Sequence, residues 1–256
     1  MVVHGPSHQR GKKNVNHHAS AQDLAILAVD RSTADEALQL VDRVGSSLLW
    51  VKLGLEIFTA EGPSIVRAMK DKGHRVFLDL KLHDIPNTVA KAVSVASGLG
   101  ADLLTLHAEG GPKMMEAAAQ AAEAEGGETK LLAVTVLTSL SGEEFPQVYQ
   151  PHPVAERVAI FAKEAEASGV HGVICSPKDL EGLGAVVSND FLRVTPGIRP
   201  AGSAVGDQVR VATPRTAIEA GASKLVIGRA VTAAADPQKA WEAILEEIAE
   251  VSTQTS

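Results

Sequence analysis

The chain has 256 residues, of which 45% are apolar and 3% are aromatic, and its formal net charge at pH 7 is −7. This length allows one large domain with an aliphatic core, and the negative charge argues against a general nucleic-acid binder. The single cysteine, Cys175, excludes an internal disulfide and is typical of a cytoplasmic protein.

The first part of the chain differs from the rest. Residues 1–20 are polar and lack the apolar centre of a signal peptide, so we expect a flexible tail there. No apolar run approaches the length of a membrane span, and no membrane partner is expected. From Leu24 onward, apolar runs alternate with segments of helical spacing. The apolar runs predict eight strands, at Leu24–Val29, Leu48–Leu53, Arg75–Lys81, Asp102–His107, Leu131–Leu137, Val170–Cys175, Phe191–Thr195 and Lys224–Ile227.

The segments between these strands carry helix signals. Ser32 and Thr33 precede two acidic residues as a helix start, and Gly45 follows as its stop. Later helices are predicted at Gly62–Lys72, Thr88–Leu99, Lys113–Glu125, Val154–Ala167, Lys178–Leu183, Thr213–Ala220 and Pro237–Val251. Eight strands, each followed by a helix, predict a single-domain (β/α)8 TIM barrel over residues 21–256. An open doubly wound sheet is the alternative fold, which the regular units and the lack of a second domain disfavour.

The segment from residue 77 to residue 88 is the centre of the candidate site. Side chains alternate between the two faces of a strand, so Asp79 and Lys81 are expected on one face and the intervening leucines on the other. Asp84 and Thr88 follow just past the strand end. A buried strand carries charges only where they are paired or used, so the motif is either a structural ion pair or part of a catalytic site.

In a (β/α)8 barrel the active site lies at the carboxyl ends of the strands. The polar residues expected at those ends are therefore the candidates. A single histidine at a strand end is more often structural, so His107 is left outside the catalytic set. The polar residues expected at the strand ends, of which all but His107 are kept as candidates, are Asp30, Lys52, Asp79, Lys81, His107, Thr138, Arg199 and Arg229.

The ends of the last two strands favour a phosphate site. Barrels often bind phosphate with the loops after strands seven and eight. Gly228 permits close approach of the backbone, and Arg229 adds a bidentate donor. Arg199 begins a polar loop that contains Gln208 and is long enough to close over a ligand.

The charges on the first three strands allow two kinds of chemistry. Lys81 lies between carboxylates, which keeps it protonated and suits it to donating a proton. An array of Lys52, Asp79, Lys81 and Asp84 suits decarboxylation followed by protonation of the carbanion. Alternatively, Asp79 and Asp84 are magnesium ligands that stabilise an enediolate. The residue types alone leave both readings open.

The same residues carry a resemblance to a known family. The run Asp79-Leu80-Lys81-Leu82-His83-Asp84-Ile85-Pro86-Asn87-Thr88 resembles the signature of the bacterial type of orotidine 5′-phosphate decarboxylases. The resemblance extends from Leu24 to about Ile248. It includes Ala28-Val29-Asp30, Val51-Lys52-Leu53-Gly54, Val136-Leu137-Thr138-Ser139, Thr195-Pro196-Gly197-Ile198-Arg199-Pro200, Gly206-Asp207-Gln208 and Ile227-Gly228-Arg229.

The resemblance implies a reaction and the residues that catalyse it. Enzymes of this family remove CO2 from orotidine 5′-monophosphate to give uridine 5′-monophosphate, the last step of pyrimidine nucleotide synthesis, without a metal or organic cofactor. Lys81 would protonate C6 of the pyrimidine, and Asp79 would lie against the departing carboxylate. Lys52 and Asp30 would contact the ribose hydroxyls and complete the charged network.

The resemblance also implies roles for the remaining positions. Asp84 and Thr88 would reach into the neighbouring subunit's site, so that the active unit is a homodimer, and Thr138 would help to recognise the base. The phosphate would be bound by Gln208, Gly228 and Arg229, with Arg199 and Gln208 on a closing lid.

Two alternatives remain beside this reading. The magnesium-dependent sugar-phosphate decarboxylases and synthases share an Asp-x-Lys-x-x-Asp core, but the continuation Ile85–Thr88 and the segment Gly206–Gln208 favour the orotidine enzymes. A barrel that only binds a nucleotide is the second alternative. It is disfavoured because a buried charged array is costly to keep without use.

Overall fold

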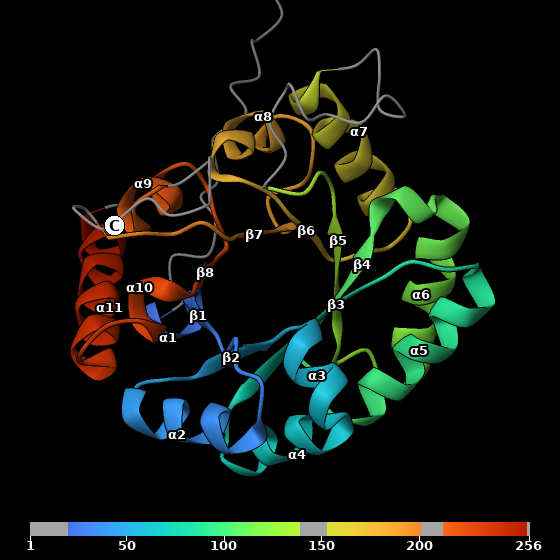
Figure 1. Cartoon of the computed structure of the whole chain (residues 1–256). Coiled ribbons are helices and arrows are strands. Elements are labelled where there is room, and N and C mark those ends of the chain that lie inside the picture. The colour runs from blue at the N-terminus through green and yellow to red at the C-terminus, as the bar shows by residue number, and fades with distance from the viewer. Residues whose placement is uncertain (1–19, 139–152, 201–211, 255–256) are drawn as a thin grey trace, which may run out of the picture.

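The computed structural model describes residues 20–138, 153–200 and 212–254. Within them, eight parallel strands close into a barrel in sequence order, and helices form an outer ring around it (Figure 1). The predicted (β/α)8 barrel is therefore confirmed. The strands are β1 (Ala25–Ala28), β2 (Trp50–Leu53), β3 (Arg75–Leu82), β4 (Leu103–His107), β5 (Lys130–Val134), β6 (Gly172–Ile174), β7 (Leu192–Thr195) and β8 (Lys224–Ile227).

The helices follow the strands as the sequence pattern predicts, with several short additions. The expected tail lies outside the described residues except for Ser20, and so does Gln208. No helix in the described ranges is long and apolar enough to cross a membrane. The helices are α1 (Ala21–Leu24), α2 (Ala34–Val44), α3 (Leu55–Glu61), α4 (Pro63–Asp71), α5 (Pro86–Gly98), η1 (Ala108–Gly110), α6 (Pro112–Ala124), α7 (Val154–Ala167), η3 (Pro177–Asp179), α8 (Leu180–Gly184), α9 (Pro214–Glu219), α10 (Arg229–Thr232) and α11 (Pro237–Gln254).

The helix predicted at Gly62–Lys72 is confirmed as α4, but the helix before it was not predicted. Two helices, α3 and α4, occupy the segment after β2. The chain turns between them at Gly62, whose φ of 62° suits glycine, and Pro63 then starts α4. Helix α3 has no capping side chain at its start, where Gly54 stands, so the sequence lacks the usual signal for it. By contrast, Thr33 caps α2 as predicted, accepting a hydrogen bond from the backbone N–H of Glu36.

Alternation along the strands divides the core into two layers. On β1, Ile26 points into the barrel, where it joins Trp50, Phe77 and Val226, whereas Leu27 faces the surrounding helices. The inner layer also contains leucine and valine from the other strands, and it fills the barrel below the site. Cys175 is fully buried in the outer layer. This packed interior supports a rigid ring of strand ends on which functional groups are held.

A cationic cluster closes the amino-terminal end of the barrel. Lys224 begins β8, and its Nζ lies 4.2 Å from the ring centroid of Trp50, which begins β2. The guanidinium of Arg75 lies 5.3 Å from the same ring, and Lys224 Nζ donates a hydrogen bond to the carbonyl oxygen of Asp23. Burial lowers the pKa of Lys224 from 10.5 to about 8, with Arg75 acting in the same direction and Asp23 opposing both. Below pH 8 the charged Lys224 ammonium therefore lowers the stability of the folded state.

Replacing Lys224 with methionine is expected to change how stability depends on pH. Between about pH 8 and pH 10.5 the unfolded chain binds the Lys224 proton and the folded chain has lost it, so the wild type gains stability as the pH rises. Relative to Lys224→Met, this gain is at most about 3.5 kcal/mol, since one pKa unit corresponds to about 1.4 kcal/mol. Urea unfolding of both proteins from pH 7 to pH 10 measures the difference. The exposed Lys239→Met is the control, and curves for Lys224→Met and wild type that stay parallel would contradict the expectation.

Candidate active site

A cavity of about 160 Å³ lies at the carboxyl ends of the strands. Four of the predicted site residues line it together: Lys52 from β2, Asp79 and Lys81 from β3, and Thr138 just after β5. Most of the remaining wall is apolar. It is formed by Phe77, Val134, Val136, Leu137, Ile174, Pro196 and Val226. The cavity thus places charged groups against a surface suited to a flat, weakly polar ring.

The charged groups form an alternating chain across three strands. Lys81 Nζ donates to Asp79 Oδ1 at 2.9 Å, and Lys52 Nζ lies 3.5 Å from Asp79 Oδ2. Lys52 Nζ also lies 3.5 Å from Oδ1 of Asp30, which follows β1. The exposed fraction of the side chain is 63% at Asp30 and 13% at both Lys52 and Asp79. The chain of charges therefore runs from solvent into the protein, with Asp79 between two ammonium groups.

Asp79 is held as a carboxylate in a buried position. Burial alone would raise its pKa, but Lys52 and Lys81, together with hydrogen bonds from Lys81 and Thr105, outweigh that effect and lower the pKa below its ordinary value. A negative charge is therefore fixed at the wall of the cavity at neutral pH. Such a charge interacts more strongly with a bound group than it would in water.

Strand β3 presents these charges through an irregular end. Its pairing with β4 runs from Leu78↔Leu104 to Leu82↔Leu106, so the register shifts across the intervening residues. Lys81 has a φ of 50°, the only positive φ outside glycine in the described part of the chain. The leucines before and after it line a groove on the outer face of the barrel, whereas Asp79 and Lys81 line the cavity. The predicted division of faces is therefore confirmed.

Asp84 and Thr88 lie away from this array within one chain. Both side chains are exposed beyond the end of β3, and Asp84 Oδ1 accepts a hydrogen bond from the backbone N–H of Ile85 at 2.6 Å. Among the described residues, no ion pair joins Asp84 to Lys52 or Lys81. An array that includes Asp84 therefore does not form within a single subunit.

The ends of β7 and β8 bring two arginines into electrostatic contact. Arg199 follows β7 and donates to the carbonyl oxygen of Ile198 at 2.9 Å, and Arg229 begins α10 directly after Gly228. Burial lowers the pKa of Arg199, and the nearby charge of Arg229 lowers it further. Two guanidinium groups that repel one another at the strand ends are suited to an anionic ligand. The predicted partner Gln208 lies outside the described residues.

The comparison with known sequences identifies the family. The sequence model described as "Orotidine 5'-phosphate decarboxylase / HUMPS family" matches residues 24–244. The chain belongs to this family. The resemblance carried by the β3 motif is thereby confirmed.

Two curated relatives of this family member are named orotidine 5'-phosphate decarboxylase. The one from Cutibacterium acnes is 49% identical over 223 residues, 87% of this chain and 94% of the relative. The one from Halorhodospira halophila is 46% identical over 224 residues, 88% of this chain and 95% of the relative. A crystal structure of orotidine 5'-phosphate decarboxylase from Lactobacillus acidophilus superposes with a TM-score of 0.79 at 38% identity, covering 88% of this chain and 98% of that one.

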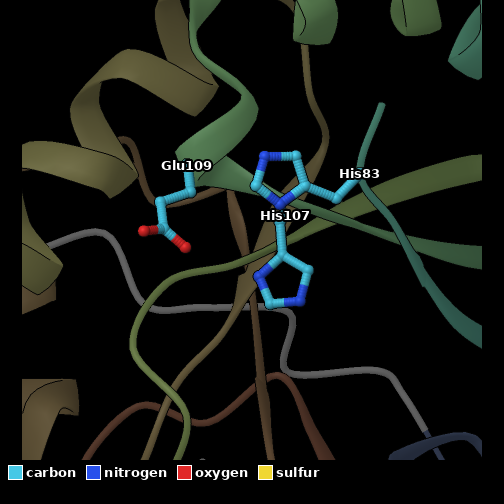
Figure 2. A group of neighbouring side chains, drawn as sticks. All are labelled: His83, His107 and Glu109. Atoms are coloured by element: carbon cyan, nitrogen blue, oxygen red, sulfur yellow. The ribbon is translucent and has the colours of Figure 1, made fainter. Parts of the chain in front are cut away.

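In this orotidine 5'-phosphate decarboxylase / HUMPS family member, one described group of side chains has metal-ligand spacing. Figure 2 shows the rings of His83 and His107 side by side near the carboxylate of Glu109, and their ligand atoms lie within 4.8 Å of one another. Burial lowers the pKa of His107, which favours the neutral imidazole that a metal binds. However, His83 and Glu109 are exposed. Among the described residues, no hydrogen bond orients the ring of His83 or His107, whereas the histidines of a resident metal site are held by such bonds. The cluster therefore has ligand chemistry without a prearranged geometry.

Sequence reasoning missed Thr105. It lies on β4, is fully buried, and donates a hydrogen bond from its hydroxyl to Asp79 Oδ1 at 2.9 Å. The available signal was a polar residue set among Leu103, Leu104 and Leu106. Threonine is common in strands, so its presence there does not by itself indicate a site.

Proposed function

We propose that this chain catalyses the decarboxylation of orotidine 5′-monophosphate to uridine 5′-monophosphate and CO2, the last step of pyrimidine nucleotide biosynthesis, in the cytoplasm. The observation that carries the proposal is the buried carboxylate of Asp79, held between the ammonium groups of Lys52 and Lys81 at the wall of the cavity. Support comes also from the family match and from curated relatives of that name at 42–49% identity.

The array suggests how the reaction proceeds. The substrate carboxylate would lie beside Asp79, where like charge disfavours the bound ground state and favours loss of neutral CO2. As the C6–carboxylate bond breaks, its electron pair stays on C6 and takes a proton from the Lys81 ammonium. Lys81 then regains a proton from solvent. Interactions stronger in the transition state than in the ground state are the ones that accelerate this step.

The other polar strand ends would bind the rest of the nucleotide. Asp30 and Lys52 would contact the ribose hydroxyls, and Thr138 the base. Gly228, Arg229 and Gln208 would bind the phosphate, with Arg199 and Gln208 on the loop that closes over it. Binding energy at the remote phosphate can then support the unfavourable charge placement at the reacting carbon.

The donor set around Asp79 disfavours the magnesium-dependent alternative. That reading requires Asp79 to ligate a divalent cation together with Asp84. Oδ1 of Asp79 already accepts from Lys81 and Thr105, and Oδ2 faces Lys52 at 3.5 Å. A divalent cation at the same carboxylate would be repelled by both ammonium groups. We therefore propose a reaction that needs neither a metal nor an organic cofactor.

The active unit is proposed to be a homodimer in which Asp84 and Thr88 complete the neighbouring site. An apolar groove of about 410 Å³ lies between β3 and α5, lined by Leu80, Leu82 and Val95 among others. Ile85 and Val95 are 65% and 63% exposed, although both are large apolar residues. An apolar patch of this kind beside the exposed Asp84 and Thr88 is typical of an interface.

Introducing a charge into this groove is expected to dissociate the dimer. Val95→Asp would place a carboxylate against apolar surface of the partner, where it has no solvent. We expect a shift from dimer to monomer at micromolar concentration, with turnover falling at least about tenfold because the neighbouring site loses Asp84. Light scattering coupled to gel filtration measures the mass. Lys113→Asp, on the exposed surface of α6, is the control, and a dimeric, fully active Val95→Asp protein would contradict the assignment of this face.

The proposed reaction is tested by ultraviolet-monitored turnover of orotidine 5′-monophosphate in excess chelator. Rapid loss of substrate with formation of uridine 5′-monophosphate would support a metal-free decarboxylase. Activity only with magnesium and a sugar phosphate would replace this proposal with the related barrel enzymes. Tight nucleotide binding without turnover in either assay would leave a non-catalytic binding protein.

A further inference from the structure

Thr105 occupies the point where β3 and β4 lose their regular pairing. Between the pairs Leu78↔Leu104 and Leu82↔Leu106, three residues of β3 face the single residue Thr105. The backbone N–H of Lys81 donates to Thr105 Oγ1 at 2.9 Å. The hydroxyl therefore replaces a main-chain acceptor that the bulge has removed, and it satisfies a donor that would otherwise be left without one.

The direction of the second hydrogen bond is fixed by chemistry. A threonine hydroxyl has one proton to donate. Because the Lys81 N–H can only donate, Thr105 Oγ1 is the acceptor there, and its own proton goes to Asp79 Oδ1 at 2.9 Å. One buried hydroxyl thus joins the backbone of Lys81 to the carboxylate of Asp79, and both of its bonds have a single possible polarity.

The backbone at Lys81 needs this support. Its φ of 50° lies in the left-handed region, which is unfavourable for a residue with a Cβ. Such conformations persist where surrounding contacts fix them. The contacts of Lys81 with β4 include the bond to Thr105, and its Nζ is directed to the same Asp79 oxygen that Thr105 binds. The Thr105 hydroxyl therefore fixes the strained backbone of Lys81 and the carboxylate of Asp79 directly. It fixes the Lys81 ammonium through that carboxylate.

We propose that Thr105 is a positioning residue for the decarboxylation, setting the location of the Lys81 ammonium and the Asp79 carboxylate relative to the reacting carbon. The inference rests on the proposed function and adds to it a residue that touches neither the substrate nor the cavity wall. Removing the hydroxyl leaves the Lys81 N–H and Asp79 Oδ1 each short of one partner, and the bulge is free to relax. A displacement of about 1 Å in a catalytic group can reduce the rate about a hundredfold.

The test compares Thr105→Val, which keeps the shape and removes the hydroxyl, with Thr105→Ser, which keeps the hydroxyl. For Thr105→Val we expect kcat to fall about a hundredfold, whereas KM and the Kd of uridine 5′-monophosphate change less than about threefold, because the phosphate end is untouched. For Thr105→Ser we expect kcat to recover to within about tenfold of wild type. The acid limb of the pH profile of kcat should also move to higher pH in Thr105→Val, since one cause of the lowered Asp79 pKa is removed.

A matched control separates positioning from a general loss of stability. Thr129 is also buried, and its hydroxyl donates to the carbonyl oxygen of Ala101 at 2.7 Å, at the opposite end of the barrel. Thr129→Val should lower the unfolding midpoint about as much as Thr105→Val while leaving kcat and its pH profile unchanged. If Thr105→Val does not fold, Thr105→Ala, whose smaller side chain admits water, takes its place.

Three results would overturn the inference. Wild-type kcat in the hydroxyl-free variant is the first. An equal loss of kcat in Thr105→Val and Thr129→Val is the second, because it would make the effect one of stability. Failure of Thr105→Ser to recover any activity is the third. Absence of turnover in the wild type itself would instead overturn the proposed function, and with it this role, so the two failures are distinguishable.

Discussion

Lys81→Ala is expected to reduce turnover of orotidine 5′-monophosphate by about 10⁴-fold, the upper end of what a single proton-transfer group contributes. The variant loses the ammonium that lies 2.9 Å from Asp79 Oδ1, and among the charged groups on the cavity wall only Lys52, which faces Oδ2, remains near that carboxylate. The carbanion at C6 then has no proton donor in the array. Alanine keeps a Cβ at the left-handed backbone position, so the strain at residue 81 is unchanged and the fold should survive.

Binding provides the second half of this expectation. The Kd of uridine 5′-monophosphate should change by less than about tenfold, because the proposed phosphate contacts at Gly228 and Arg229 lie on another strand end. Stopped ultraviolet assays give the rate, and calorimetric titration gives the affinity. Lys113→Ala on the exposed face of α6 serves as the control. Turnover by Lys81→Ala within tenfold of wild type would remove Lys81 from its proposed role as proton donor.

The barrel could be predicted from the sequence because its signal is repeated. Each of eight apolar runs is short, but together with the helical segments between them they favour one architecture, and errors at single boundaries do not alter it. The helix that was missed lies where local signals are weak. Helix α3 begins at Leu55 after Gly54, which offers no capping side chain, and the break at Gly62 depends on a positive φ that glycine permits but does not require.

Only those parts of the site that lie within a single strand could be predicted from the sequence. Asp79 and Lys81 alternate on one strand, so their shared face follows from sequence spacing. The proposed role of Thr105 depends on the register between β3 and β4, which shifts between Leu78 and Leu82 and has no marker in either strand. Asp84 shows a different limit, because its proposed function involves a second subunit and the described chain leaves it exposed. The spacing of residues in the sequence therefore does not reveal the contacts of the site between strands or between chains.

Three irregular features occur together near the end of β3. A regular β3 would pair fully with β4 and would leave Lys81 in extended geometry. The observed strand instead gives up main-chain pairing, adopts a strained φ and buries a carboxylate between two lysines. Each feature is unfavourable for stability on its own, and hydrogen bonds of Thr105 contact both the Lys81 backbone and the Asp79 carboxylate. Departure from local consistency where charges line a cavity is typical of a functional site.

Mixing two inactive variants is expected to restore activity, if Asp84 acts in the neighbouring subunit. Lys81→Ala has a defective cavity but an intact Asp84, whereas Asp84→Ala has an intact cavity but supplies no carboxylate to its partner. In a heterodimer of the two, one site combines an intact Lys81 with an intact Asp84, and the other site lacks both. Random exchange makes half of the dimers heterodimers with one working site each, so about a quarter of wild-type activity should return.

The recovery of activity depends on subunit exchange, so it tests whether Asp84 acts in the neighbouring subunit. Activity should rise with incubation time after mixing and should stay near zero when each variant is incubated alone. A mixture of Lys81→Ala with Asp79→Ala is the control, since both changes lie on the same cavity wall within one chain and no heterodimer site is intact. If the mixture of Lys81→Ala and Asp84→Ala stays inactive although exchange is shown by mass, Asp84 acts within its own subunit. The loop after β3 would then have to turn inward, away from the exposed position where the Asp84 carboxylate now accepts from the N–H of Ile85.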